Sequence, residues 1–76
     1  MTVYLVNDDP FGNNVRVIDK NAGDAQIFNG YINANSEQVI PDCRENDSGN
    51  GNIATSQDGN PWIGRSFLKE GDRISL

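Results

Sequence analysis

The sequence contains no histidine and only one cysteine, Cys43, in 76 residues. A disulfide within the chain is therefore excluded. A structural zinc site of histidine and cysteine is excluded as well, because one thiolate cannot hold the metal alone. A domain of this length buries only about 60% of the surface that its unfolded chain exposes, so it usually needs a further source of stability. The sources that remain are a compact core, a cation held by oxygen ligands, and association with another subunit.

The chain is also poor in basic residues. It has six Lys and Arg residues against eleven Asp and Glu residues, which gives a formal net charge of -5. The basic residues stand singly, so no cluster can neutralise successive phosphates, and nucleic-acid binding is disfavoured. An anionic membrane surface would repel a protein of this charge. We therefore expect neither a nucleic acid nor a membrane as partner.

Long apolar runs are missing too. No segment approaches the roughly 18 apolar residues of a membrane-spanning helix, and Met1–Val6 lacks the basic and apolar regions of a secretory signal. A lone cysteine suits a reducing compartment better than an oxidising one. The default expectation is a soluble cytoplasmic protein, although a mature secreted form stripped of its signal would have the same pattern.

Asparagine and aspartate are abundant, with eleven Asn and eight Asp, and eight Gly residues add further turn formers. Short Asx side chains bond to nearby backbone and tolerate left-handed conformations, so they favour turns. Short β-branched and aromatic runs lie between these turns, and no window has helical periodicity. The sequence predicts a single all-β domain over residues 1–76. The seven predicted strands are Thr2–Val6, Asn14–Asp19, Ala25–Ile32, Glu37–Ile40, Asn52–Gln57, Trp62–Leu68 and Arg73–Leu76.

Short connections predict antiparallel pairing, and seven strands in so short a chain must form two packed layers or close on themselves. We predict a small antiparallel β-sandwich of the Greek-key type, with a small closed β-barrel as the alternative. Ala25–Ile32 is the longest run and is predicted at the centre of a sheet, whereas Glu37–Ile40, which ends at Pro41, is predicted at an edge. Asp58-Gly59 predicts a tight hairpin turn. The segment Phe67–Leu76 predicts a second hairpin.

Two predicted strands are apolar on both faces, whereas a sheet with one wet face alternates more clearly. The opposed sets are Val3 and Leu5 against Tyr4 and Val6 in the first strand, and Ile27 and Tyr31 against Phe28 and Ile32 in the third. The second apolar face needs cover from the chain's own loops or from another subunit. The sequence therefore predicts a structural or protein–protein interaction module, which self-assembles or docks on a protein partner.

Catalysis is disfavoured. Without histidine, a nucleophile could be activated only by a carboxylate or a lysine, and Cys43 is predicted to be an unreactive thiol. The carboxylate pairs Asp8-Asp9 and Glu70/Asp72 lie in predicted turns, where acidic residues are expected for backbone reasons alone. We predict that the protein is not an enzyme.

The polar loop over residues 42–52 is the candidate metal site. Calcium takes six to eight oxygen ligands, and Glu45, Asp47 and Asn50 supply such oxygens among glycines that can fold the loop around an ion. The bidentate glutamate that ends a helix-loop-helix calcium site is missing. The alternative functional prediction is thus a ligand-binding module for calcium or carbohydrate; no other cofactor is expected.

Aromatic side chains are the candidate contacts for a ligand or partner. Trp62 follows Pro61 near the predicted hairpin tip, where it either stacks on a ligand or fills the core. Phe11 lies in a predicted loop, where it either covers the core or meets a partner. The predicted contact residues are Trp62, Phe11, Tyr4 and Tyr31.

Overall fold

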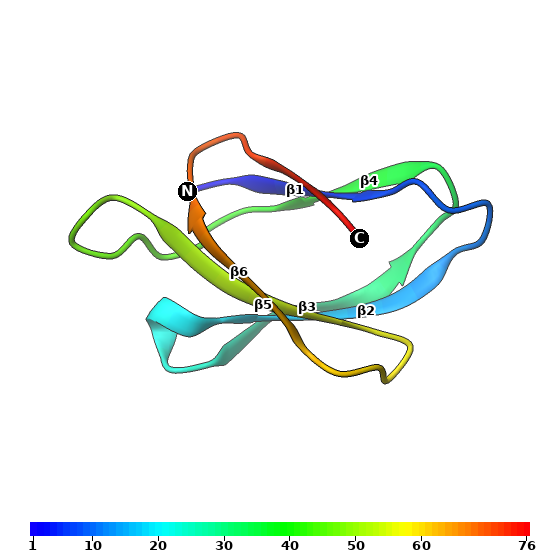
Figure 1. The fold of residues 1–76 in the computed structure, drawn as a ribbon, viewed down its shortest axis with the longest axis horizontal. Coiled ribbons are helices and arrows are strands. Elements are labelled where there is room, and N and C mark those ends of the chain that lie inside the picture. Colours follow the sequence, from blue (N-terminus) through cyan, green and yellow to red (C-terminus); the bar gives the residue numbers. More distant parts are fainter.

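The computed structural model describes all 76 residues and has seven strands in two sheets (Figure 1). The elements are β1 (Val3–Asn7), β2 (Asn13–Asp19), the 3-10 helix η1 (Lys20–Ala22), β3 (Ala25–Ile32), β4 (Ser36–Ile40), β5 (Gly51–Gln57), β6 (Ile63–Leu68) and β7 (Arg73–Ser75). Each strand begins and ends within one residue of its predicted bounds. None of the helical structure has the length and apolarity needed to cross a membrane.

The two sheets lie face to face as layers (Figure 1). The smaller sheet has the order β4-β1-β7, and the larger has the order β3-β2-β5-β6. All neighbouring strands are antiparallel except β1 and β7, which are parallel. Chain crossovers place β1 beside β4 and β7, and β2 beside β5. The sandwich is confirmed, and the closed barrel is wrong, because the strands form two separate sheets.

The core lies between the sheets and follows the period of two that strands impose on their side chains. In β2, for example, Val15 and Val17 are fully buried while Arg16 between them is exposed. Apolar burial of this kind is the main favourable term in folding. The buried cluster consists of Val3, Leu5, Val15, Val17, Ile32, Ile40, Cys43, Ile53, Leu68 and Ile74.

The strand predicted at the centre of a sheet lies at its edge. β3 borders only β2, whereas β5 occupies the interior of the larger sheet. Most of β3 is exposed or half-buried, but Ala54, Thr55 and Ser56 of β5 are all buried. Those three residues are small, so neighbouring segments of the same chain can cover both faces of β5. The length of an apolar run therefore did not predict which strand is covered on both faces, because the residues of β5 are small and partly polar. The predicted edge position of β4 is confirmed.

The two predicted turns have different outcomes. Asp58 and Gly59 have φ values of 48° and 77° and join β5 to antiparallel β6 as the predicted hairpin. At the second turn, Gly71 has a φ of 83° and the Asp72 carboxylate accepts from the Lys69 N–H at 2.8 Å. The strands on either side of it do not pair: β6 is in the larger sheet, and β7 lies parallel to β1 in the smaller one. The predicted second hairpin is wrong, because turn chemistry reverses a chain without fixing which sheet it enters.

The strands with two apolar faces are covered in two ways. A register shift between β2 and β3 disturbs the alternation of β3, and both Ile27 and Phe28 pack against the core. On the outer face of β1, the Arg73 guanidinium lies 5.3 Å from the centroid of the Tyr4 ring and pairs with Glu37. The chain therefore covers part of each second face itself.

Candidate functional site

Asp19 anchors the loops at one end of the sandwich. Its side chain is only 1% exposed. One carboxylate oxygen accepts from the Asn21 N–H at 3.0 Å, and the other accepts from the Arg44 N–H at 2.8 Å. Asn21 in turn donates to the carbonyls of Arg44 at 2.9 Å and Asn50 at 3.1 Å. Both oxygens of this buried acid are thus occupied by backbone donors, and the contact gives Asp19 a structural role.

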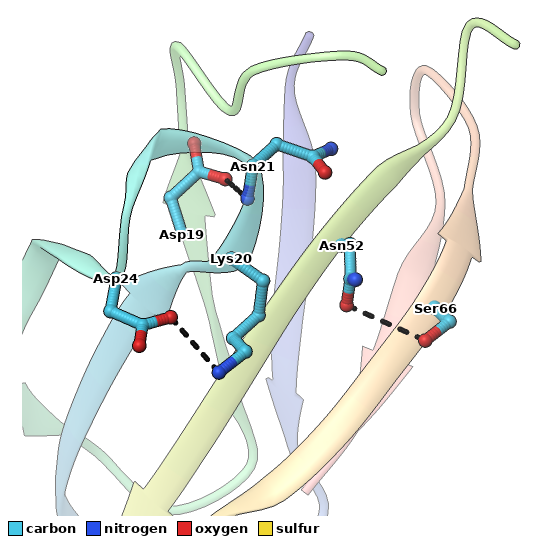
Figure 2. Close-up of polar contacts among 6 residues, drawn as sticks. All are labelled: Asp19, Lys20, Asn21, Asp24, Asn52 and Ser66. Atoms are coloured by element: carbon cyan, nitrogen blue, oxygen red, sulfur yellow. Dashed lines mark hydrogen bonds and ion pairs between the residues drawn. The ribbon is translucent and has the colours of Figure 1, made fainter. Parts of the chain in front are cut away.

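The surface beside this anchor carries ordinary polar contacts (Figure 2). Lys20 and Asp24 form an exposed ion pair of 2.9 Å within the turn that follows β2. Across the strands, Ser66 of β6 donates to Asn52 of β5 at 3.4 Å. Exposed pairs of this kind contribute about 0–1 kcal/mol each, so they add little to the network beneath them.

The loop predicted to bind calcium is organised by Asn46, a residue that was not among the predicted ligands. Its side-chain oxygen accepts from the N–H groups of Ser48 at 2.9 Å and Asn50 at 3.0 Å. Such side-chain-to-backbone bonds are the reason that asparagine favours turns. Sequence reasoning assigned the loop's polar residues to an ion, although the same residue type also serves the loop's own backbone.

The three predicted calcium ligands have different surroundings. Glu45 and Asp47 are exposed, and the Asn50 side-chain oxygen accepts from the Lys69 ammonium at 2.6 Å. No group of three or more Asp, Glu or Cys side chains is clustered closely enough to hold a metal ion. A cation bound through Asn50 would have to displace the ammonium already there. Calcium binding at this loop remains a prediction.

The carboxylate pairs considered for catalysis are also placed by the structure. Asp8 and Asp9 are exposed in the loop after β1. Glu70 accepts from the Thr2 N–H at 3.1 and 3.2 Å through its two oxygens, and Asp72 accepts within its own turn. The second pair therefore bonds to the backbone.

Cys43 is a core residue. It is buried, and its thiol donates to the Ile40 carbonyl at 3.8 Å. Burial raises the pKa of the Cys43 thiol, and the nearby Asp19 carboxylate raises it further. Because the thiolate is the nucleophilic form of cysteine, this environment disfavours reaction at Cys43.

The four predicted aromatic contacts do not share one surface, because Tyr4 belongs to a different sheet from Tyr31. Trp62 is 43% exposed, and its ring centroid lies 5.1 Å from the Arg16 guanidinium carbon, so it does not fill the core. Tyr31 and Phe11 are also exposed, in β3 and in the loop between β1 and β2. Tyr4 lies half-buried on the outer face of the other sheet. The structure therefore does not collect these side chains into one site.

The free edge of β6 carries several exposed apolar side chains. Trp62 comes directly before this strand, Ile63 is 49% exposed, and Phe67 is 78% exposed. The chain has six exposed large hydrophobic side chains in all, and these are three of them. We call residues Trp62–Phe67 the β6 edge. Sequence reasoning selected Trp62 but missed the other two, because it did not place β6 at an edge.

The backbone of the β6 edge follows from the pairing of β5. Asp58 donates its N–H to the Asn14 carbonyl at 2.8 Å, so even-numbered residues of β5 point their backbone groups toward β2. Alternation along the strand then turns Ile53 and Thr55 toward β6. In β6, Ile63 and Arg65 face them, while the backbone N–H and C=O groups of Gly64 point away from the sheet. The β6 edge therefore presents a row of unpaired backbone groups.

Phe67 has an unusual backbone conformation. Its φ is 59°, and it lies where a register shift interrupts the pairing of β5 and β6. A bulky residue in the left-handed region costs roughly 1–2 kcal/mol. Its largely exposed ring recovers little of that energy by burial, so the fold maintains a strained residue that points an aromatic ring into solvent. No sequence signal indicated this conformation.

No pocket opens on the protein surface, at the β6 edge or elsewhere. Comparison with known proteins returned no match among protein families, curated sequences or solved structures.

Proposed function

We propose that this protein is a non-enzymatic structural module that works through protein–protein contact, and that its partner is a second copy of the same chain. The observation that carries the proposal is the β6 edge, where unpaired backbone groups and three exposed apolar side chains occur together. Edge strands of this kind are templates for pairing with another chain unless they are blocked.

The apolar side chains supply the driving force. Burial of apolar surface contributes about 25 cal/mol per Å², and Phe67 and Ile63 are both largely accessible to a partner. A partner that covers their rings and aliphatic atoms would gain stability from surface that the folded chain leaves in water. Exposed apolar side chains gathered on one element are characteristic of interaction sites.

The charge distribution supports a second copy as the partner. The chain has a net charge of -5, yet residues 61–69 contain no Asp or Glu and include Arg65 and Lys69. Two copies of an acidic protein repel each other over most of their surfaces. The β6 edge is a place where they can approach without bringing carboxylates together.

Sedimentation equilibrium tests this proposal over protein concentrations from about 1 µM to 1 mM, the range of weak to moderate association. We expect the mass to rise from the 8.3 kDa of the single chain toward twice that value. The double variant Ile63→Thr/Phe67→Ser should remain a monomer over the same range.

Val39→Thr is the matched control, because Val39 is an exposed apolar residue on the other sheet. It should associate like the native chain. A native chain that keeps a mass of 8.3 kDa at the highest concentration would refute self-assembly.

A further inference from the structure

We infer that two copies pair through their β6 strands in antiparallel orientation, with Gly64 of one copy opposite Gly64 of the other across a two-fold axis. This inference rests on the proposed self-assembly and specifies its geometry. It would join the two larger sheets into one continuous sheet.

The direction of the backbone groups restricts the residues that can exchange hydrogen bonds across the axis. Ile63 and Arg65 are bonded to β5, so only Trp62, Gly64 and Ser66 turn their N–H and C=O groups toward a second copy. With Gly64 on the axis, Gly64 exchanges hydrogen bonds with its own counterpart. Trp62 then exchanges them with Ser66 of the second copy.

The number of hydrogen bonds selects Gly64 for the axis. Asn60 already donates its N–H to the Gln57 carbonyl in the turn, so an axis at Trp62 would pair Gly64 with a residue that is not free. Phe67 has the left-handed backbone that interrupts regular pairing, and an axis at Ser66 would place this irregularity beside the axis. An axis at Ile63 or Arg65 would exchange hydrogen bonds through only two residues of each copy. The axis at Gly64 uses all three residues.

The outer face of the paired strands has space for the larger side chains. A Cβ atom at Gly64 would meet nothing within 4 Å, so the surface over this residue is open. In antiparallel pairing, Trp62 of each copy is a diagonal neighbour of Gly64 of the other, at about 7–8 Å. An indole ring is long enough to cover that glycine, as aromatic side chains do for edge glycines elsewhere.

The inner face avoids contact between like charges. Ile63 of each copy lies opposite Arg65 of the other, so the two guanidinium groups are not placed directly across from each other. The aliphatic stem of arginine packs well against apolar groups while its charged end remains in water. The Nε atom of Arg65 is buried without a hydrogen-bond partner in the single chain, which places the stem of this residue close against the protein.

The available area indicates a dimer of modest affinity. The isolated chain exposes 4381 Å², and a standard interface removes about 800 Å² from each partner. Pairing along one short strand falls at the lower end of this range. We expect a dissociation constant on the order of 10 µM, within the range that sedimentation covers.

Cross-linking tests the register. In the Gly64→Cys variant, the two introduced Cα atoms would be about 5.5 Å apart across the axis, which a disulfide can span. The free space at Gly64 accommodates the new side chain in the single chain, and buried Cys43 does not compete.

Asn29→Cys is the matched control. It introduces an exposed cysteine in β3, at the opposite edge of the same sheet. Under mild oxidation at about 50 µM protein, a few times the expected dissociation constant, we expect Gly64→Cys to form covalent dimer at least about tenfold faster than this control. Equal rates would overturn the Gly64 register.

Gly64→Pro tests the backbone pairing. The Gly64 N–H points away from β5, so proline here removes no hydrogen bond within the chain, as is usual for proline on an edge strand. We expect at least a tenfold weaker dimer, with circular dichroism and the melting temperature close to those of the native chain. If this variant fails to fold, the cross-linking comparison decides the register by itself.

The outcomes separate the two proposals. A native chain that never dimerises overturns both self-assembly and β6 pairing. A native dimer that survives folded Gly64→Pro and does not cross-link through Gly64→Cys overturns β6 pairing and leaves self-assembly standing.

Discussion

The polar groups of the loops around Asp19 have hydrogen-bond partners within the chain, whereas backbone groups of the β6 edge do not. At Asp19, buried side-chain oxygens are matched with N–H groups from two loops, and Asn21 adds two further bonds to carbonyls. Along β6, the N–H and C=O groups of Gly64 find no partner within the chain, and apolar side chains flank them. The first region uses chemically versatile residues for structure, whereas the second exposes backbone groups and apolar side chains, the features on which the proposed interaction rests.

This difference explains why residue type alone did not indicate the proposed interaction surface. The Asp and Asn residues of the 42–52 loop attract attention as ion ligands, yet Asn46 bonds to its own loop and Asn50 accepts from Lys69. Glycine and phenylalanine do not indicate a site by their side-chain chemistry, although Gly64 and Phe67 define the paired segment that we propose. The region where polar groups lack partners is more informative than the region where polar groups are numerous.

The largest expected effect comes from breaking the Asp19 network. Asp19→Ala removes the carboxylate that accepts from the part-buried N–H groups of Asn21 and Arg44, and a hydrogen bond to a charged group contributes about 1.5–3 kcal/mol. We expect the free energy of unfolding to fall by about 3 kcal/mol, measured by urea denaturation followed by circular dichroism. Asp24→Asn is the control: it removes the charge of the exposed ion pair with Lys20, which contributes about 0–1 kcal/mol, and asparagine tolerates the left-handed backbone at this position. Equal losses in the two variants would contradict the structural role of Asp19.

A pH-dependent effect of intermediate size should arise from Cys43. Because its pKa is raised in the folded protein, the unfolded chain loses the thiol proton first as the pH rises. Stability is therefore complete below the ordinary thiol pKa and declines above it, by at most about 1.4 kcal/mol per pH unit. Urea denaturation between pH 7 and 10 measures this decline. The slope should be smaller in Cys43→Ala, and an unchanged slope would assign the effect to other groups.

The Phe67→Gly variant tests whether the β6 edge favours association at the expense of the stability of the single chain. Glycine adopts a positive φ without the steric penalty that phenylalanine carries, so relief of strain should stabilise the single chain by about 1 kcal/mol. The same change removes an exposed apolar ring and should weaken dimerisation. Urea denaturation at low protein concentration and sedimentation at high concentration measure the two effects separately. A destabilised single chain would show that the Phe67 ring contributes more to the fold than its exposure suggests.

Calcium should have the smallest effect. With the Asn50 oxygen held by Lys69, we expect any site to be no tighter than about 1 mM, so that 1 mM calcium stabilises the fold by at most about 0.4 kcal/mol. Thermal melts with calcium and with chelator measure the shift. A rise of several degrees that disappears in Asp47→Ala/Asn50→Ala would instead establish this loop as a calcium site.

The sequence was sufficient for local structure. Short β-branched and aromatic runs between turn-forming residues located the strands, and Asp58-Gly59 identified the turn between β5 and β6. These features depend on residues that are neighbours in the chain. The partners of each strand depend on distant residues: β7 pairs with β1 although its turn resembles a hairpin, and β3 lies at an edge although its apolar run is the longest.

The candidate site was only partly predictable for the same reason. Trp62 was selected as an aromatic residue near a turn, and its exposure became clear once β6 was placed at an edge. The φ of Phe67 could not be foreseen, because phenylalanine disfavours the left-handed region. That conformation occurs where the pairing of β5 and β6 shifts register, and the shift involves residues distant in the chain.

The parallel contact of β1 with β7 also sets an order of events during synthesis. Tyr4 in β1 lies beside Val39 of β4 and Arg73 of β7, so the first strand must wait for residues made much later. Closing such long loops is entropically costly and slows folding. The pairs β2–β3 and β5–β6 need only short loops and should form earlier. Until β7 has left the ribosome, β1 remains an apolar segment without its full set of neighbours, and the newly made chain is then most exposed to aggregation.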